Sequence, residues 1–309
     1  MYLSLSGLTN KMNFLKKRIS LFVVLLFLVT AVYPQDSVSL KFFSPRIPFN
    51  KLDKSGSDKS IIYNKVFIYT PKEYKKNRVS YPLVYLLHGW AGSSYDWKNN
   101  YDIQKLADKY KMIIVLPDGY YDSWYGDNIN KKELQYESAF FKRIVPFVET
   151  RYRIDPKNVF ITGLSMGGHG AISFYLKHNK HFKAAGSMSG ILDISLFKDK
   201  WGIKKKFGDY KKYKKYWEKN SSVQLLKTFK GAKSNLRMFV TCGDKDFAYK
   251  ANSLFWSAAA NLKIPMISVK DKGDHNWEYW TSHIDSQILF FSLVAQNNSI
   301  EQIKKKMKL

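Results

Sequence analysis

The feature that most constrains this chain is the pentapeptide Gly163-Leu164-Ser165-Met166-Gly167, a G-x-S-x-G pattern. An apolar, β-branched run over residues 158–162 precedes it, and a run typical of a helix follows to about Lys177. A serine on a sharp turn between a strand and a helix holds its Oγ out of the sheet, and the cramped turn requires small flanking residues. The helix start also directs its N–H groups to where an oxyanion would form. The pattern therefore favours Ser165 as a nucleophile over an incidental serine in a glycine-rich turn.

Residues 1–35 are predicted to be a signal peptide. A basic segment with Lys16, Lys17 and Arg18 precedes the apolar run 19–32, as is typical of secretory signals. This run is shorter than the roughly 20 residues that a membrane-spanning helix needs, so no stable membrane span is expected, and an uncleaved N-terminal anchor is the alternative. We expect a secreted or periplasmic protein. The only cysteine, Cys242, excludes an internal disulfide, which is compatible with export.

The chain is strongly basic, with a formal net charge of +26. Such a charge can favour anionic partners, among them uronate-bearing polysaccharide, anionic lipid and nucleic acid. However, the lysines are spread along the whole chain, which favours a general compositional bias. No recognised nucleic-acid-binding module accompanies the charge, so we expect no nucleic-acid partner.

Strands and helices are predicted to alternate after residue 80, which indicates an α/β fold with a doubly wound, mostly parallel sheet. The first two strands, near 38–43 and 61–69, are predicted to form an antiparallel N-terminal edge. We expect one domain over residues 36–298 with a helical insertion at about 192–234. A single long helix is predicted over 132–152, a sixth strand over 181–187, and a basic tail at 299–309 that frays.

A serine nucleophile needs a base, and the base needs an orienting acid. In α/β-hydrolases these follow in the order Ser, Asp or Glu, His. His275 comes just after a predicted strand, where catalytic groups gather in open sheets, and is predicted as the base. The other downstream histidines lie within helices or have no acid between them and the serine: His169, His178, His181 and His283. Asp244 and Asp246 both follow the preceding strand and are both candidates for the acid.

An oxyanion needs two backbone N–H donors. Met166, the residue after the nucleophile, is expected to supply one. Trp90 is expected to supply the other, because it follows the His88-Gly89 end of a buried strand and Gly89 lets the backbone approach the substrate. His88 itself is expected to hydrogen-bond the loop and not to transfer protons.

These motifs resemble those of the esterase D-like family of α/β-hydrolases, which includes S-formylglutathione hydrolases, feruloyl and acetylxylan esterases, and mycolyltransferases. The resemblance covers about residues 38–295 and includes His88-Gly89-Trp90, residues 158–171 and Ser187-Met188-Ser189-Gly190. Residues 242–247 resemble the family's C-G-x-x-D-F motif, which implies Asp246 as the acid. Residues 275–280 resemble its H-x-W-x-x-W motif, which supports His275 and implies that Trp277 binds substrate.

Two segments bear on the substrate. The loop after Pro117 also matches the family, and in it Trp124 and Tyr125 either line an acyl or sugar site or only pack the loop. The segment Lys204–Trp217 interleaves lysines with aromatic residues. It either caps the pocket and stacks sugars, or forms a solvated helix whose aromatic side chains pack inward.

The combined prediction is an exported serine esterase that acts on a feruloyl or acetyl ester linked to polysaccharide. One alternative is an acyltransferase of the mycolyltransferase type, which would use the same triad. The other is a carbohydrate-binding module with an idle triad. No metal site is expected, because the acidic residues and histidines show no ligand spacing, and no cofactor is expected.

Overall fold

The structure is a computed structural model that describes residues 35–43 and 61–309. The predicted signal peptide lies outside these residues, apart from its last residue, Gln35. Among the helices so described, none combines the length and apolar character needed to cross a lipid bilayer.

One mixed sheet organises the described residues. Its eight strands run in the order β1-β2-β4-β3-β5-β6-β7-β8. They are β1 (Gln35–Phe43), β2 (Ile61–Tyr69), β3 (Tyr81–Leu87), β4 (Ile113–Pro117), β5 (Ile154–Gly163), β6 (Ala184–Met188), β7 (Met238–Gly243) and β8 (Met266–Asp271). The pairs β1–β2 and β2–β4 are antiparallel, and every later pair is parallel. The predicted parallel sheet with an antiparallel N-terminal edge is confirmed.

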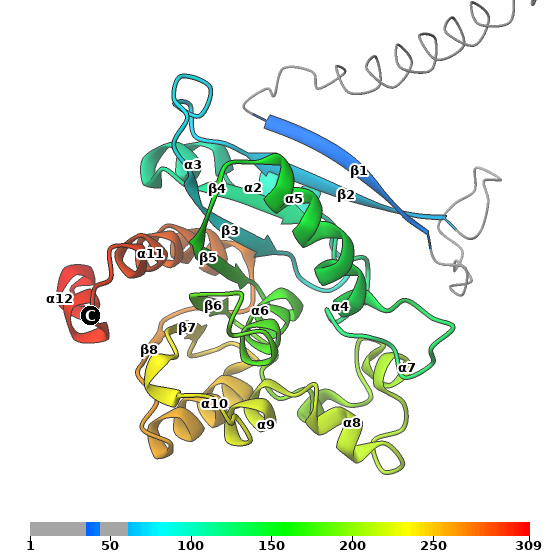
Figure 1. The fold of residues 1–309 in the computed structure, drawn as a ribbon. Coiled ribbons are helices and arrows are strands. Elements are labelled where there is room, and N and C mark those ends of the chain that lie inside the picture. Colours follow the sequence, from blue (N-terminus) through cyan, green and yellow to red (C-terminus); the bar gives the residue numbers. More distant parts are fainter. Residues whose placement is uncertain (1–34, 44–60) are drawn as a thin grey trace, which may run out of the picture. The chain divides into compact units, whose positions relative to one another are not determined.

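Helices cover both faces of the sheet. α3 (Ile103–Tyr110), α11 (Trp277–Ala295) and α12 (Ile300–Met307) pack on one face, and α6 (Met166–Lys177) and α10 (Tyr249–Asn261) pack on the other. Figure 1 shows α11 and α6 on opposite sides of β5 and β6. This alternation of strand and helix brings the carboxyl ends of β3, β5, β7 and β8 to one edge, where loop residues can meet.

Central strands that are buried on both faces carry continuous apolar runs. In β3, Val84 and Leu86 join the core on the α11 side, whereas Tyr85 contacts Phe140 with ring centroids 5.1 Å apart. From β5, Phe160 stacks on Phe291 of α11 at 4.9 Å. Burying a side chain of this size contributes about 1.5–3 kcal/mol, so these pairs hold the nucleophile strand firmly in the sheet.

The helix predicted over 132–152 begins later and is interrupted. It consists of α4 (Tyr136–Ala139), a π-helical segment (Phe140–Ile144) and α5 (Val145–Arg151). Pro146 lies at the start of α5 and cannot donate a backbone hydrogen bond, so the wider π turn before it avoids the clash that an α turn would create. The sixth strand also differs: residues 178–181 form a turn, so β6 begins at Ala184.

The expectation that the C-terminal tail frays is wrong. Its residues form α12, which starts with a capping box between Ser299 and Gln302. Ile300 and Ile303 are buried against the core that contains α11. The two isoleucines, three residues apart on one helix face, outweigh the basic residues around them.

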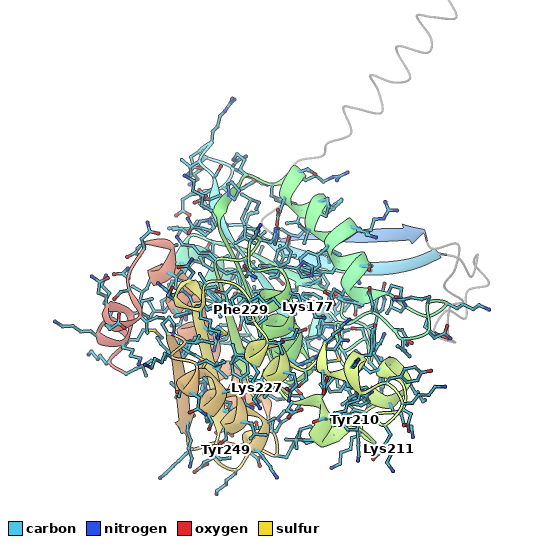
Figure 2. All side chains as sticks on the ribbon, turned by 60° about the horizontal axis from the view of Figure 1, so that its bottom comes forward. Lys177, Tyr210, Lys211, Lys227, Phe229 and Tyr249 are labelled. Atoms are coloured by element: carbon cyan, nitrogen blue, oxygen red, sulfur yellow. The ribbon has the colours of Figure 1, made fainter. Side chains whose placement is uncertain are left out.

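The predicted insertion consists of short helices: α7 (Ile203–Phe207), α8 (Lys214–Glu218) and α9 (Ser222–Lys227), with 3-10 turns at Ile194–Phe197 and Lys233–Asn235. The large aromatic side chains Phe207 and Trp217 are buried within it. The inward-packing alternative for Lys204–Trp217 is therefore the correct one. Figure 2 shows Tyr210 and Lys211 at the outer end of the insertion.

Candidate active site

Ser165 occupies the sharp turn between β5 and α6. Its backbone has φ 52° and ψ −114°, a region that non-glycine residues rarely adopt. Any Cβ at Gly163 would lie 2.7 Å from the Leu87 carbonyl oxygen, and one at Gly167 would lie 2.6 Å from the His88 carbonyl oxygen. The two glycines therefore let the turn press against the end of β3.

His275 joins the serine to a buried carboxylate. Its Nε2 lies 2.9 Å from Ser165 Oγ, and its Nδ1 lies 2.8 Å from Asp246 Oδ1. Because a carboxylate only accepts hydrogen bonds, the imidazole donates from Nδ1, which leaves Nε2 free to accept the serine proton. The Ser165, His275 and Asp246 predicted from the sequence thus lie together in the arrangement of a catalytic triad.

The structure also distinguishes the two candidate acids. Asp246 is buried, contacts His275 and accepts a hydrogen bond from the Ala248 backbone N–H at 2.7 Å. Asp244 is exposed and accepts from the Gly273 N–H at 3.3 Å, as a turn residue does. Burial raises the pKa of the Cys242 thiol well above its usual value, and its hydrogen bond to Asp246 adds to this shift. The thiol beside Asp246 is therefore neutral.

The loop after β3 adjoins the nucleophile. A Cβ at Gly89 would lie 3.6 Å from the Ser165 Cβ. In the part of the chain that the structure describes, the backbone N–H groups of Trp90 and Met166 donate to no protein acceptor. Both predicted oxyanion donors are therefore available to a substrate oxygen.

His88 holds this loop. Its Nδ1 lies 2.8 Å from the Gly89 carbonyl oxygen, and its Nε2 accepts from the Gly119 N–H at 2.7 Å. Since Gly119 occupies Nε2 as a donor, Nδ1 carries the proton and donates to Gly89. The ring is buried and both of its nitrogens are occupied, which confirms a role in hydrogen-bonding the loop.

A pocket of about 480 Å³ opens over Ser165 and His275. Its walls are largely aromatic. The remaining lining residues are Gly89, Trp90, Asp96, Trp124, Leu164, Trp201, Phe247, Asn276, Trp277 and Trp280. Such a mixture of apolar rings and a few polar groups is typical of small-molecule sites.

The predicted substrate-binding residues divide into two groups. Trp124 and Trp277 line the pocket. Tyr125 does not: it is buried, and its hydroxyl donates to the His88 carbonyl oxygen at 3.0 Å, so its assignment to substrate binding is corrected to a supporting role beneath the loop.

Sequence reasoning missed Asp96 and Trp201. Trp201 comes from the insertion and reaches the pocket through tertiary packing, so no local pattern marked it. Asp96 is the only carboxylate on the pocket wall within the described residues. The signal for it was its place shortly after the predicted oxyanion strand.

No group of three or more His, Cys, Asp or Glu residues within 35–43 and 61–309 is placed to hold a metal ion. Buried His169, in α6, lies outside the triad. Burial lowers its pKa to about 3, so its ring is neutral near pH 7.

Comparisons with known proteins agree with this geometry. A family model described as "Putative esterase" matches residues 63–291. The acetyl esterase of Caldicellulosiruptor saccharolyticus is 31% identical over 230 residues, which cover 69% of this chain and 84% of that protein. The Mycobacterium tuberculosis diacylglycerol acyltransferase/mycolyltransferase Ag85A is 24% identical over 251 residues, or 69% of this chain and 74% of that protein.

Among solved structures, a ferulic acid esterase superposes with a TM-score of 0.67 at 25% identity, covering 84% of this chain and 98% of that one. The family match, the doubly wound sheet and the serine elbow lead to one conclusion: this chain belongs to the putative esterase family and is an ester hydrolase of the α/β-hydrolase fold.

Proposed function

We propose that the protein is an exported serine esterase that removes acetyl or feruloyl groups from polysaccharide. The observation that carries the catalytic part is the 2.9 Å contact between Ser165 Oγ and His275 Nε2, with Asp246 on the other ring nitrogen. The names of two similar proteins, an acetyl esterase and a ferulic acid esterase, support the acyl groups.

The proposed reaction has two halves. Ser165 Oγ attacks the ester carbonyl carbon while His275 Nε2 takes the hydroxyl proton, and the carbonyl oxygen becomes an oxyanion held by the Trp90 and Met166 N–H groups. His275 then gives the proton to the alcohol oxygen as its bond to carbon breaks, leaving an acyl-serine. A water molecule attacks this ester, again losing its proton to His275, and the tetrahedral intermediate collapses. The carboxylic acid leaves as Ser165 recovers the proton.

The direct test compares the wild type with Ser165→Ala on p-nitrophenyl acetate, methyl ferulate and acetylated xylan. We expect the wild type to hydrolyse at least one ester and the variant to lose about 10⁶-fold in kcat. A fluorophosphonate probe should label the wild type and not the variant. Equal inactivity of both proteins on all esters, together with no labelling, would count for the idle binding module.

Because the chain is also similar to an acyltransferase, a second experiment must determine whether water or another hydroxyl compound accepts the acyl group. With a radiolabelled acetyl donor, water as the acceptor gives labelled acetate, whether or not a saccharide is added. If label moves mainly to an added saccharide and little acetate forms, the transferase alternative is correct.

Export is supported by the basic and apolar pattern of residues 1–35. Mass spectrometry of the protein recovered from culture medium or periplasm should show a mature N-terminus between the apolar run and β1. Full-length protein confined to the cytoplasmic fraction would contradict export.

A further inference from the structure

The insertion contributes one aromatic ring to the catalytic pocket. Trp201 precedes α7 and, among the insertion's described residues, it alone lines the pocket that contains Ser165 and His275. Phe247 lines the same pocket from the loop that carries Asp246.

Trp124, Trp201 and Phe247 form a continuous row of aromatic rings that ends at the imidazole of His275. Trp124 and Trp201 have centroids 6.4 Å apart and planes tilted by 31°. Trp201 and Phe247 follow at 5.3 Å and 37°, and Phe247 and His275 at 4.0 Å and 36°. Phe197 contacts both central rings, with centroids 5.2 Å from Trp201 and 6.1 Å from Phe247.

The backbone holds this row at a conformational cost. Trp124 has φ 50° and Trp201 has φ 51°, in the left-handed region that bulky residues rarely adopt. The indole N–H of Trp124 donates to the Trp201 carbonyl oxygen at 3.0 Å and ties the two segments together. Strained residues that persist beside a reactive serine are typical of functional positions.

Phe247 is also unusually accessible. Its side chain is 49% exposed, although it lies against a histidine that is itself largely buried. An exposed ring at the mouth of an aromatic pocket offers surface for a ligand to cover.

The direction of proton transfer determines which part of the ester lies beside this row of rings. His275 must deliver its proton to the alcohol oxygen, so the alcohol part of the substrate must lie next to the imidazole. Phe247 packs face-on against that imidazole and Trp280 packs against it edge-on, at 5.1 Å. Trp201 is the next ring outward from Phe247. We propose that Trp201 and Phe247 form an alcohol-side subsite that stacks against the face of a ring carried by the leaving alcohol.

This inference rests on the proposed esterase function and narrows its substrate class. The ring of the leaving alcohol must present an apolar face to Trp201 and Phe247. The sugar of an O-acetylated saccharide offers such a face, and so does an aryl alcohol. The experiment therefore includes one ester of each kind.

The test uses three acetate esters that differ only in the alcohol: ethyl acetate, benzyl acetate and O-acetylated methyl xyloside. We expect Trp201→Leu to reduce kcat/KM about tenfold more for a ring-bearing ester than for ethyl acetate. Phe247→Leu should also reduce kcat/KM more for a ring-bearing ester than for ethyl acetate. This variant is sufficient for the test if Trp201→Leu does not fold. A selective loss on benzyl acetate identifies an aryl alcohol, and one on the xyloside identifies a saccharide; either supports the subsite.

Tyr210→Leu is the matched control, because Tyr210 lies on the same insertion, packs on Trp217 and lies outside the pocket. It should keep the wild-type ratio between esters. Equal losses on all three acetates would overturn the subsite, as would a selective loss on methyl ferulate, whose ring is on the acyl side. Failure of the esterase function itself would appear separately, as wild-type activity on ethyl acetate no higher than that of Ser165→Ala.

Discussion

Two aspartates two positions apart have different surroundings, and the difference predicts different kinetics. Asp246→Asn removes the carboxylate that orients the His275 tautomer, so kcat should fall by about 10³–10⁴-fold. The matched variant Asp244→Asn alters an exposed turn residue and should stay within a few-fold of the wild type. Steady-state kinetics on p-nitrophenyl acetate checks both, and a larger loss in Asp244→Asn would reassign the acid.

A second residue predicts a pH dependence of stability. Burial lowers the pKa of Lys206 in the folded protein to about 8, while the carboxylates of Asp122, Asp127 and Glu133 oppose that shift. Below pH 8 the lysine is charged in both states and its burial cost is fully present. Between pH 8 and its unfolded pKa of 10.5 only the unfolded state keeps the proton, so rising pH stabilises the fold.

Lys206→Met should therefore be more stable than the wild type at pH 7, by about 3 kcal/mol. The difference in free energy of unfolding between the two proteins should decrease between pH 8 and 10.5. Urea unfolding at several pH values measures it. Parallel pH profiles for the two proteins would show that this lysine does not titrate as stated.

Among the elements, α12 gives the clearest mutational prediction. Ile303 is fully buried, so Ile303→Ala should lower the free energy of unfolding by about 2–5 kcal/mol. Lys304→Ala, on the exposed side of the same helix, should change it by less than about 0.5 kcal/mol. Equal effects of the two variants in urea unfolding would mean that the helix does not dock on the core.

Among the helices and strands, those with long periodic patterns were predicted well from the sequence, and those that depend on tertiary packing were predicted poorly. The strands with continuous apolar runs and the elbow at Ser165 were clear, because local spacing and glycine chemistry determine them. The π turn before Pro146 and the docking of α12 depend on contacts with distant segments. Ser165 and His275 could be predicted because their order in the chain is characteristic, and the choice of Asp246 over Asp244 came from the family resemblance. Trp201 and Asp96 reach the pocket only through the fold.

Across the whole molecule, the described residues combine a rigid sheet with a pocket built from separate loops. β3, β5, β7 and β8 each end near the site and deliver the oxyanion loop, Ser165, Asp246 and His275 in turn. The insertion adds one aromatic ring, Trp201, to the pocket without contributing to the triad. A substitution at Trp201 can therefore change specificity while the triad stays intact.

The aromatic pocket also allows ligand binding to be followed by intrinsic tryptophan fluorescence. Five of its eight tryptophans line that one pocket: Trp90, Trp124, Trp201, Trp277 and Trp280. Occupancy should shift or quench the intrinsic emission, so titrating a product alcohol or acid into Ser165→Ala gives an affinity without turnover. A Trp201→Leu version should lose the part of the signal that alcohols cause and keep the part that acids cause.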